Sequence, residues 1–197
     1  MHPCGQVTTI DITGTDYFGA LRSGEIDVAL GRFHQDPPAD LVQGPVMSQE
    51  DWLLGVAVDH PLAGLDDVSV EELASYPIFG VPDALTGKLH NPLYPVVTPS
   101  GRPIERRGIA RTFAEVLALV AGKEIVFPAT ESFPRYYGHP GVVFVPLRGW
   151  PPGTRTLIWR AHEKTPLIGA FIRLATQQPP RQNPGYGTWI GPRTLGE

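Results

Sequence analysis

The residues best placed for chemistry in this sequence are hydroxyl side chains at the ends of predicted strands. Thr13 and Thr15 stand where a strand expected over residues 6–13 turns into a short helix. Hydroxyl groups and free backbone N–H groups at such a turn suit an anion such as a carboxylate. Ligands of open α/β sheets bind beyond the carboxyl ends of the strands, so both threonines are candidate ligand-binding residues. The alternative is that Thr15 only caps its own helix.

Four further polar residues occupy comparable positions, and most have a structural alternative. Arg32 follows a predicted strand, where it can pair with a carboxylate through two hydrogen bonds or form an internal salt bridge. Thr98 and Ser100 lie in the rigid turn TPSGRP, which either lines a cleft or only turns the chain. Thr130 offers one more hydroxyl group after a strand. Together with Thr13 and Thr15, these residues predict a site for a small anionic or polar molecule.

Signatures of catalysis and metal binding are missing from the sequence. It contains no GxSxG, P-loop, GxGxxG or HExxH motif. Its 6 histidines do not pair at metal-ligand spacing, and the single cysteine, Cys4, has only His2 near it. His60 precedes a proline and is expected to be a hydrogen-bonding turn residue. We therefore expect no catalytic residue, no metal and no cofactor.

Composition limits the partners and the location of the chain. Its 197 residues are 42% hydrophobic, which is enough for one domain or two small lobes with a core. The net charge of −4 argues against DNA binding by this chain alone. The longest apolar runs are too short to cross a membrane, and no signal peptide is visible. A cytoplasmic protein is the simplest expectation.

Strands and helices alternate along the chain, which predicts an α/β fold with largely parallel sheets. Strands are expected at 6–13, 26–30, 52–58, 77–82, near 96–97, and at 125–127, 141–147 and 156–160. Helices are expected at 16–23, from 69 to 73, from 112 to 121 and from 165 to 175. The strand at 26–30 is expected to be buried on both faces.

Capping residues mark the ends of these helices. Gly24 is expected to end the first helix in a left-handed conformation, and Gly122 to close the third. Ser69, Thr112 and Thr165 are expected to cap helix starts. The buried side of the last helix is predicted to comprise Leu167, Ile168, Phe171, Ile172, Leu174 and Ala175. Residues 177–197 lack hydrophobic periodicity and predict a Pro/Gly-rich tail, unless Trp189 and Ile190 anchor it as a strapped-down extension.

Several motifs occur in an order and at a spacing typical of one family. They are LRSGEIDVAL at 21–30, DHPLA at 59–63, VSVEELA at 68–74, EVLALVAG at 115–122 and IVFPAT at 125–130. From Val7 to Ala175 the chain thereby resembles the effector-binding domain of LysR-type transcriptional regulators. Each motif is weak by itself, but the set is specific. Lys123 and Glu124 depart from the small residues usual in that family.

This resemblance implies a fold and a division of the chain. The family has two α/β lobes joined by two crossovers, similar to type 2 periplasmic binding proteins, with a small-molecule effector between the lobes. Lobe I would comprise residues 1–53 plus 143–176, lobe II residues 54–142, and the tail residues 177–197. The family's helix-turn-helix and its first strand–helix unit are not found before the strand at 6–13. Lobe I is therefore expected to be incomplete at the N-terminus.

An incomplete lobe I has a predicted consequence for assembly. The strand at 6–13 or 26–30 should present an unpaired edge, and Ile10 and Ile12 should lose their cover. We therefore expect self-association, a borrowed strand or marginal stability. The other explanation is that the sequence begins at a late start codon and that the natural product is longer. A third is that the tail fills the vacant strand position.

The leading function is effector sensing within a LysR-type regulator that lacks its DNA-binding domain. One alternative is a solute-binding protein of the same fold, which cell fractionation would distinguish. Another is an enzyme that uses the cleft, which turnover of a metabolite would reveal. The sequence does not name the effector or the target genes.

Overall fold

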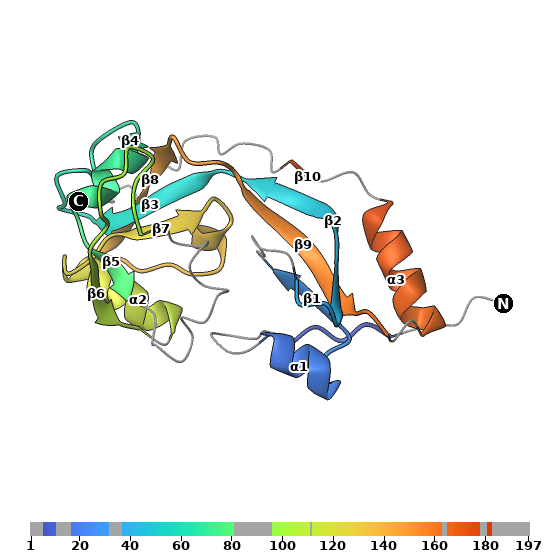
Figure 1. Ribbon diagram of the computed structural model, residues 1–197. Helices are drawn as coiled ribbons and strands as arrows, with labels where there is room; N and C mark the ends of the chain where they lie inside the picture. Colours follow the sequence, from blue (N-terminus) through green and yellow to red (C-terminus); the bar gives the residue numbers. More distant parts are fainter. Residues whose placement is uncertain are drawn as a thin grey trace.

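The computed structural model describes residues 6–10, 17–31, 37–80, 96–110, 112–162, 165–177 and 181–182. Its strands form two main sheets, one in each of two lobes that lie side by side (Figure 1). The sheet of lobe I contains β1 (Val28–Gly31), β2 (Leu41–Glu50), β9 (Gly153–Arg160) and β10 (Arg181–Gln182). The sheet of lobe II contains β3 (Trp52–Ala57), β4 (Val68–Ser69), β7 (Phe127–Thr130) and β8 (Val142–Arg148).

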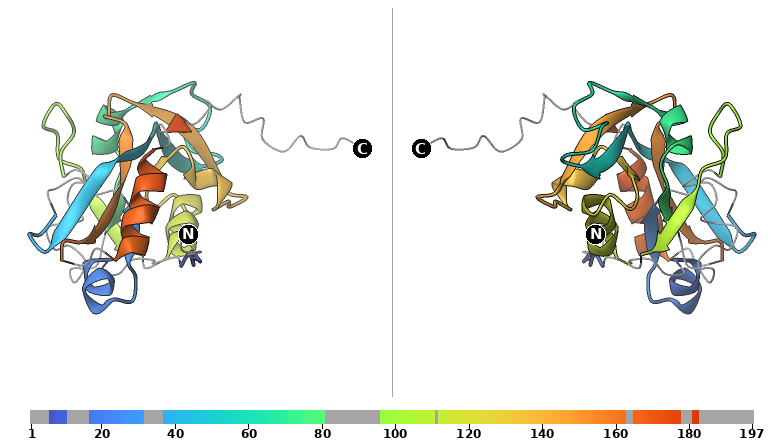
Figure 2. Two further views of the ribbon diagram at one scale, coloured as in Figure 1. Left: turned by 90° about the vertical axis from the view of Figure 1, so that its right-hand side faces the viewer. Right: turned by 90° about the vertical axis from the view of Figure 1, so that its left-hand side faces the viewer.

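Lobe I is built around β9, which runs antiparallel to both β1 and β2. Helix α1 (Tyr17–Ser23) packs on this sheet through a small core. That core consists of Phe18, Leu21, Ala29, Leu41 and Ile158. Helix α3 (Pro166–Thr176) lies on the side of lobe I that faces away from lobe II (Figures 1 and 2).

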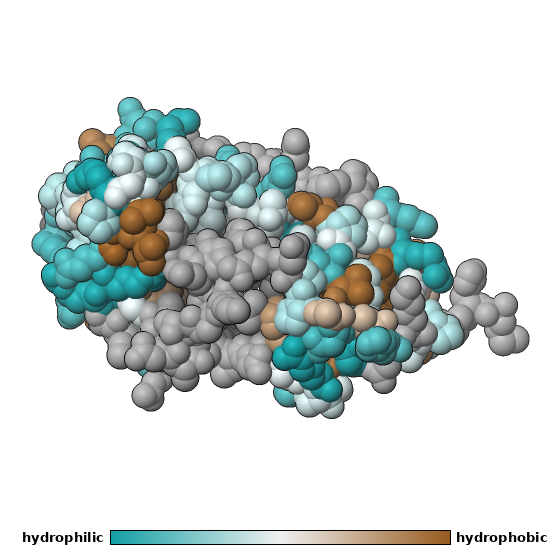
Figure 3. Space-filling view, viewed as in Figure 1, coloured by the Kyte–Doolittle hydropathy of each residue, from teal (hydrophilic) through white to brown (hydrophobic). Residues whose placement is uncertain are grey.

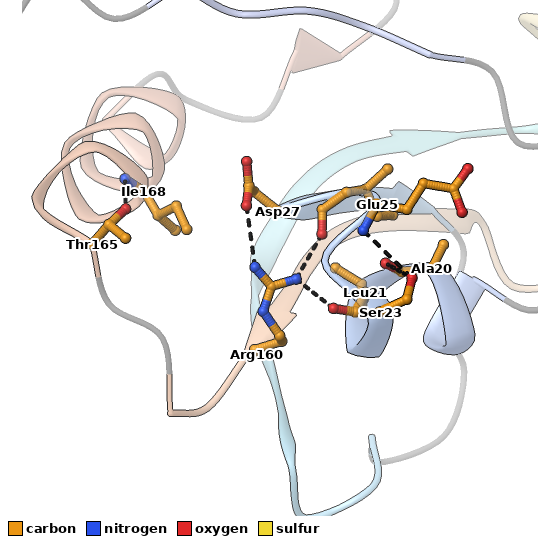
Figure 4. A network of polar contacts seen from close by, with 9 residues as sticks. Ala20, Leu21, Ser23, Glu25, Asp27, Arg160, Thr165 and Ile168 are labelled. Atoms are coloured by element: carbon orange, nitrogen blue, oxygen red, sulfur yellow. Dashed lines mark hydrogen bonds and ion pairs between the residues drawn. The ribbon is translucent and has the colours of Figure 1, made fainter.

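The end of α1 is fixed to the sheet by an arginine from β9. Gly24 adopts a φ of +78°, so the predicted left-handed stop is confirmed. The Arg160 guanidinium donates to the carbonyl oxygens of Leu21 and Ile26, and it pairs with the Asp27 carboxylate at 3.1 Å (Figure 4). A cation at the C-terminal end of a helix also complements the helix dipole. The sequence motif around Gly24 therefore ends the helix and joins it to β9.

Lobe II has the larger core, around the sheet of order β4-β8-β3-β7. Helix α2 (Phe113–Ala121) packs against β3, and the pair β5 (Ile78–Gly80) and β6 (Arg106–Ile109) adjoins β7 through a bridge from Ile78 to Val126. Two short 3₁₀ helices, η1 (Val70–Ala74) and η3 (Phe133–Arg135), connect strands. The Thr112 side chain accepts from the Glu115 N–H, as its predicted cap requires. No helix within the described ranges is long and apolar enough to span a membrane.

The described chain crosses between the lobes at two places. Asp51 alone separates β2 from β3, and residues 149–152 separate β8 from β9. Because β8 pairs with β3 throughout, from Trp52 opposite Leu147 to Ala57 opposite Val142, it belongs to lobe II. The expected boundaries after residue 53 and before residue 143 therefore differ from the sheet pairing, which moves them to Asp51 and to residues 149–152.

Strand direction is the main error of the sequence-based prediction. Four pairings are antiparallel, whereas β10 with β2, β4 with β8 and β5 with β6 are parallel. The short crossovers explain the difference, because two nearly continuous ribbons pass through both lobes and return beside each other. One ribbon is β2 followed by β3 and the other is β8 followed by β9. They run in opposite directions, so β9 pairs antiparallel with β2 and β8 pairs antiparallel with β3.

Several local predictions are also wrong. Residues 6–10 form no strand and are exposed, while 11–13 lie outside the described residues. Leu30 is 58% exposed, so the strand at 26–30 is not buried on both faces. The segment at 69–73 forms a 3₁₀ helix, and the strand expected near 96–97 is only a bridge from Val97 to Pro103. Strand β6 appears instead at 106–109.

The last helix is less covered than its pattern predicts. Its Thr165 cap and Pro166 start are confirmed. Of the predicted buried side only Ile168 is buried, whereas Leu167 and Leu174 are exposed because α3 lies at the outer side of lobe I. Figure 3 shows apolar surface in separate patches on both lobes. Just after α3, residues 181–182 of the predicted tail pair with β2 beside Ser48 and Gln49.

Two turn predictions have clear outcomes. The Leu62 N–H donates to Nδ1 of His60 at 3.2 Å, which confirms His60 as a hydrogen-bonding turn residue. Gly122 caps α2 with a φ of −75°, and the left-handed residue is Lys123, at +60°. The Lys123 ammonium pairs with Asp59 in the same region. The positive φ is uncommon for a residue with a side chain, and the Lys123 N–H donates to the Val120 carbonyl at 3.0 Å.

Candidate functional site

The structure describes three of the six predicted site residues, and all three belong to lobe II. Thr98 and Ser100 lie in the loop before β6, and Thr130 is the last residue of β7. Thr13, Thr15 and Arg32 lie outside the described residues. Thr98 and Ser100 thus share one loop, whereas Thr130 ends a strand of the main sheet of lobe II.

Thr98 and Ser100 stabilise a tight turn against η1. The Thr98 N–H donates to the Arg102 carbonyl at 2.8 Å, and Gly101 supplies the positive φ of +84° that the turn requires. Ser100 donates twice to the Glu71 carboxylate, from its N–H at 2.9 Å and from its hydroxyl at 2.5 Å. These hydrogen bonds, with that from Thr98, lower the pKa of Glu71. The hydroxyl groups thus already have a structural role within lobe II.

Thr130 occupies a different position, at the junction between the lobes. It pairs with Trp52, the first residue of β3, and only 1% of its surface is exposed. Gly153, the first residue of β9, is so close that an added Cβ atom would lie 3.1 Å from Thr130 Cγ2. Thr130 therefore touches the strand with which the chain re-enters lobe I.

A buried carboxylate lies beside Thr130. Glu50, the last residue of β2, is 7% exposed, and its Oε1 lies 3.2 Å from Nη2 of Arg155 in β9. Its Oε2 accepts from the Ser132 hydroxyl at 2.6 Å and from the Ser132 N–H at 3.3 Å. The Arg155 Nη2 also donates to the Ser132 hydroxyl oxygen at 2.9 Å. We refer to Glu50, Ser132 and Arg155 as the junction triad.

The junction triad continues a strand ladder across the crossover. Trp52 pairs with Thr130, and the Glu131 N–H then donates to the Asp51 carbonyl at 3.0 Å. At the next step the Ser132 N–H donates to the side chain of Glu50. The carboxylate thereby satisfies a backbone donor at the point where the two lobes join.

An aromatic pair occupies the second crossover. Trp52 and Trp150 stack with their ring centroids 4.6 Å apart, and the Trp52 Nε1–H donates to the Pro151 carbonyl at 2.7 Å. This contact ties residues 149–152 to the start of β3. Each crossover is therefore held by its own side-chain contacts. The two crossovers lie close together, because Trp52 at the start of β3 is opposite Leu147 near the end of β8.

Sequence reasoning missed the junction triad. Glu50 stands at the end of a strand and Arg155 within one, positions that by themselves are typical of surface residues. Ser132 lies 82 residues from Glu50, so the fold alone brings them together. The available signal was a pair of acids, Glu50 and Asp51, directly before the apolar strand of lobe II.

The arrangement suits binding and movement between two lobes. The two connections between the lobes in the described chain lie beside buried polar groups, Glu50 and Ser132. Within the described part of the chain, no group of three His, Cys, Asp or Glu side chains could hold a metal ion. The expectations of no cofactor and no catalysis remain predictions.

The fold and the junction define a two-lobed α/β domain of the type 2 periplasmic-binding-protein class. The sequence model of the LysR substrate binding domain matches residues 2–180, and the chain belongs to that family. The resemblance predicted from the motifs is thereby confirmed, as is the predicted fold class. No curated protein matches the chain in sequence.

Solved structures with the same fold include effector-binding domains and full-length regulators. The BenM effector binding domain with its effector benzoate has a TM-score of 0.65 and 20% identity, over 81% of this chain and 72% of that one. The effector binding domain of QuiR in complex with shikimate has a TM-score of 0.63 and 18% identity, over 81% and 75%. CbnR, a LysR family transcriptional regulator, has a TM-score of 0.67 and 16% identity, over 84% and 57%.

The chain is shorter than the full-length regulators that it resembles. It covers 57% of full-length CbnR and 50% of OxyR from Corynebacterium glutamicum. It thus spans about half the length of these regulators and corresponds to their effector-binding part.

Proposed function

We propose that this domain binds a small organic effector between its lobes and reports the binding through the angle between them. The observation that carries the proposal is the junction triad, which joins buried polar groups of both lobes where the chain crosses. A ligand that contacts both lobes favours one lobe arrangement over others. In a longer regulator, that shift would be relayed to DNA.

The proposed effector is anionic or polar. BenM and QuiR are structural neighbours in complex with benzoate and shikimate, both of which are carboxylates. Thr13, Thr15, Arg32 and Thr130 remain the proposed contacts, because hydroxyl and guanidinium groups suit a carboxylate. Thr98 and Ser100 are weaker members of the set, since their hydroxyl groups already bond within the turn or to Glu71.

The proposal includes binding without catalysis, in the cytoplasm, and without DNA binding by this chain alone. The net charge of −4 supports the last point, because DNA binding depends on neutralising phosphates with basic groups. Self-association is also part of the proposal. The exposed apolar side chains of Leu30, Leu167 and Leu174 in lobe I support it.

Thermal-shift screening tests the proposed function. The natural chain is melted with benzoate, with shikimate and with a panel of other metabolites. A ligand that binds only the folded state at about 100 times its Kd should add about 2.7 kcal/mol of stability. Thr15→Val should then weaken the binding by roughly 1–3 kcal/mol. Thr9→Val, at an exposed position without regular structure, is the matched control.

Two results would contradict the proposal. One is that no small molecule stabilises the chain, and the other is that a stabilising molecule is chemically converted during incubation. Unchanged affinity after Thr15→Val would remove only Thr15 from the site.

A further inference from the structure

We infer that the junction triad is a latch that holds the two lobes at one angle. Glu50 and Arg155 belong to strands of lobe I, whereas Ser132 lies in the loop that follows β7 of lobe II. Three of the four polar contacts in the triad therefore cross from one lobe to the other. The latch concerns the lobe angle itself, and its use in signalling rests on the proposed function.

The remaining contact of the triad prepares the latch within lobe I. Arg155 Nη2 lies 3.2 Å from Glu50 Oε1, while Ser132 bonds the other carboxylate oxygen. Because β2 and β9 pair directly, with Glu50 opposite Gly153 and Ser48 opposite Arg155, these two side chains move together. Ser132 is thus the movable part, and Glu50 and Arg155 form its fixed receptor.

Burial should make the latch release in one step rather than loosen progressively as the lobe angle changes. Glu50 is 7% exposed and Ser132 is 9% exposed, so water does not readily replace the serine when the lobes rotate. Hydrogen bonds to charged groups are strong, and a buried charged group without its partners is costly. A rotation that draws Ser132 away must therefore break all three crossing contacts at nearly the same time.

The backbone around the triad limits the directions of such a rotation. The Glu131 N–H bond to Asp51 and the pairing of Trp52 with Thr130 keep the loop beside the first crossover. The stacking of Trp150 on Trp52 likewise ties the second crossover to the start of β3. We expect a rotation between Glu50 and Asp51 to draw Ser132 from its receptor while these contacts stay intact.

The chain contains a matched control for the latch. Ser100 donates its N–H and its hydroxyl to the Glu71 carboxylate, as Ser132 does to Glu50. Both members of that control pair lie in lobe II, at the surface. Removing the Ser100 hydroxyl should therefore disturb a turn without altering the lobe angle.

Distance measurements between two spin labels test the latch in the absence of any ligand. Leu65→Cys in lobe II and Leu174→Cys in α3 provide exposed label sites, in the full chain with Cys4→Ser. Ser132→Ala should add a second distance population, because loss of the hydroxyl hydrogen bonds to charged partners should raise the ratio of released to latched lobes about tenfold. Ser100→Ala should reproduce the parent distribution.

A second pair of variants covers the case in which Ser132→Ala does not fold. Arg155→Lys keeps a positive charge beside Glu50 but lacks the planar fork of arginine. It should shift the same distances in the same direction, by less. The inference is overturned if the Ser132 and Arg155 variants fold and keep the parent distribution, or if Ser100→Ala changes it equally. Neither outcome depends on finding an effector, so failure of the ligand screen would not decide this test.

Discussion

Two serine–glutamate pairs in this molecule have the same local chemistry and different surroundings. Ser100 with Glu71 and Ser132 with Glu50 each combine a backbone N–H and a hydroxyl group on one carboxylate. The first pair holds a surface turn within lobe II. The second is buried, includes Arg155 and joins the two lobes.

The comparison shows that placement decides what such a pair can do. At the surface, water competes for the carboxylate and substitutes for a lost partner, so the contact contributes little to stability. At the junction the Glu50 carboxylate and Ser132 are buried, so water replaces a lost partner of the carboxylate less readily, although the Arg155 side chain is 31% exposed. The same two residue types therefore fix a local turn in one place and couple two lobes in the other.

The largest effect is expected from removing the buried carboxylate. Glu50→Ala removes the acceptor of the Ser132 N–H and hydroxyl and the anionic partner of Arg155, which should lower the free energy of unfolding by about 2–4 kcal/mol. Glu71→Ala should cost much less. Urea unfolding of both variants measures the difference, and equal losses would remove the proposed contrast between the two pairs.

A glycine at the junction provides the next test. In Gly153→Ala the new Cβ atom would lie 3.1 Å from Thr130 Cγ2 and 3.4 Å from the Trp52 ring. This crowding should destabilise the chain by about 1–3 kcal/mol and disturb the contact between the lobes. Gly64→Ala in lobe II has nothing within 4 Å of the added atom and serves as the control. If Gly153→Ala melts at the parent temperature, as Gly64→Ala should, the account of close packing at the junction is wrong.

A smaller effect is expected from the serine hydroxyl groups. Ser132→Ala should lower stability by about 1–2 kcal/mol, because it removes hydrogen bonds to charged partners. It should also increase amide hydrogen exchange at residues 131–132 more than elsewhere. Ser100→Ala should increase exchange only around its own turn. Faster exchange at 131–132 in the Ser100 variant would argue that the two pairs are coupled.

The smallest effect concerns acid. The hydrogen bond from Ser100 is the main cause of the lowered pKa of Glu71, whose usual value is 4.5. The unfolded chain therefore binds the proton first as the pH falls below about 4.5. The stabilising contribution of Glu71 is complete above that pH and is lost on further acidification. Comparing urea unfolding of the parent and of Glu71→Gln at pH 6 and pH 4 should show that the advantage of the parent shrinks at pH 4.

Local features of the fold could be predicted because neighbouring residues determine them. The left-handed stop at Gly24 and the caps at Thr112 and Thr165 depend on the side chain and its own turn. The family and its two-lobed fold followed from motifs that extend over most of the chain. Strand direction failed, because alternation of strands and helices does not specify which strands return beside each other.

The candidate site was less predictable, since distance along the chain hides its partners. Thr130 was chosen for its place after a strand, and the structure puts it at the junction. Ser100 was chosen on similar grounds, but its hydroxyl bonds to Glu71, which lies 29 residues earlier. Glu50 gave no local sign of burial, because its partners come from β9 and from the loop after β7.

Hydrogen exchange with and without an effector tests the central claim most directly. An effector identified by the thermal-shift screen should protect amides of both lobes at the junction, around residues 130–132 and 153–156. The turn at residues 98–102, whose hydroxyl groups already bond within lobe II, should be protected less than these two segments. Protection confined to one lobe, or greatest at residues 98–102, would contradict a ligand site between the lobes.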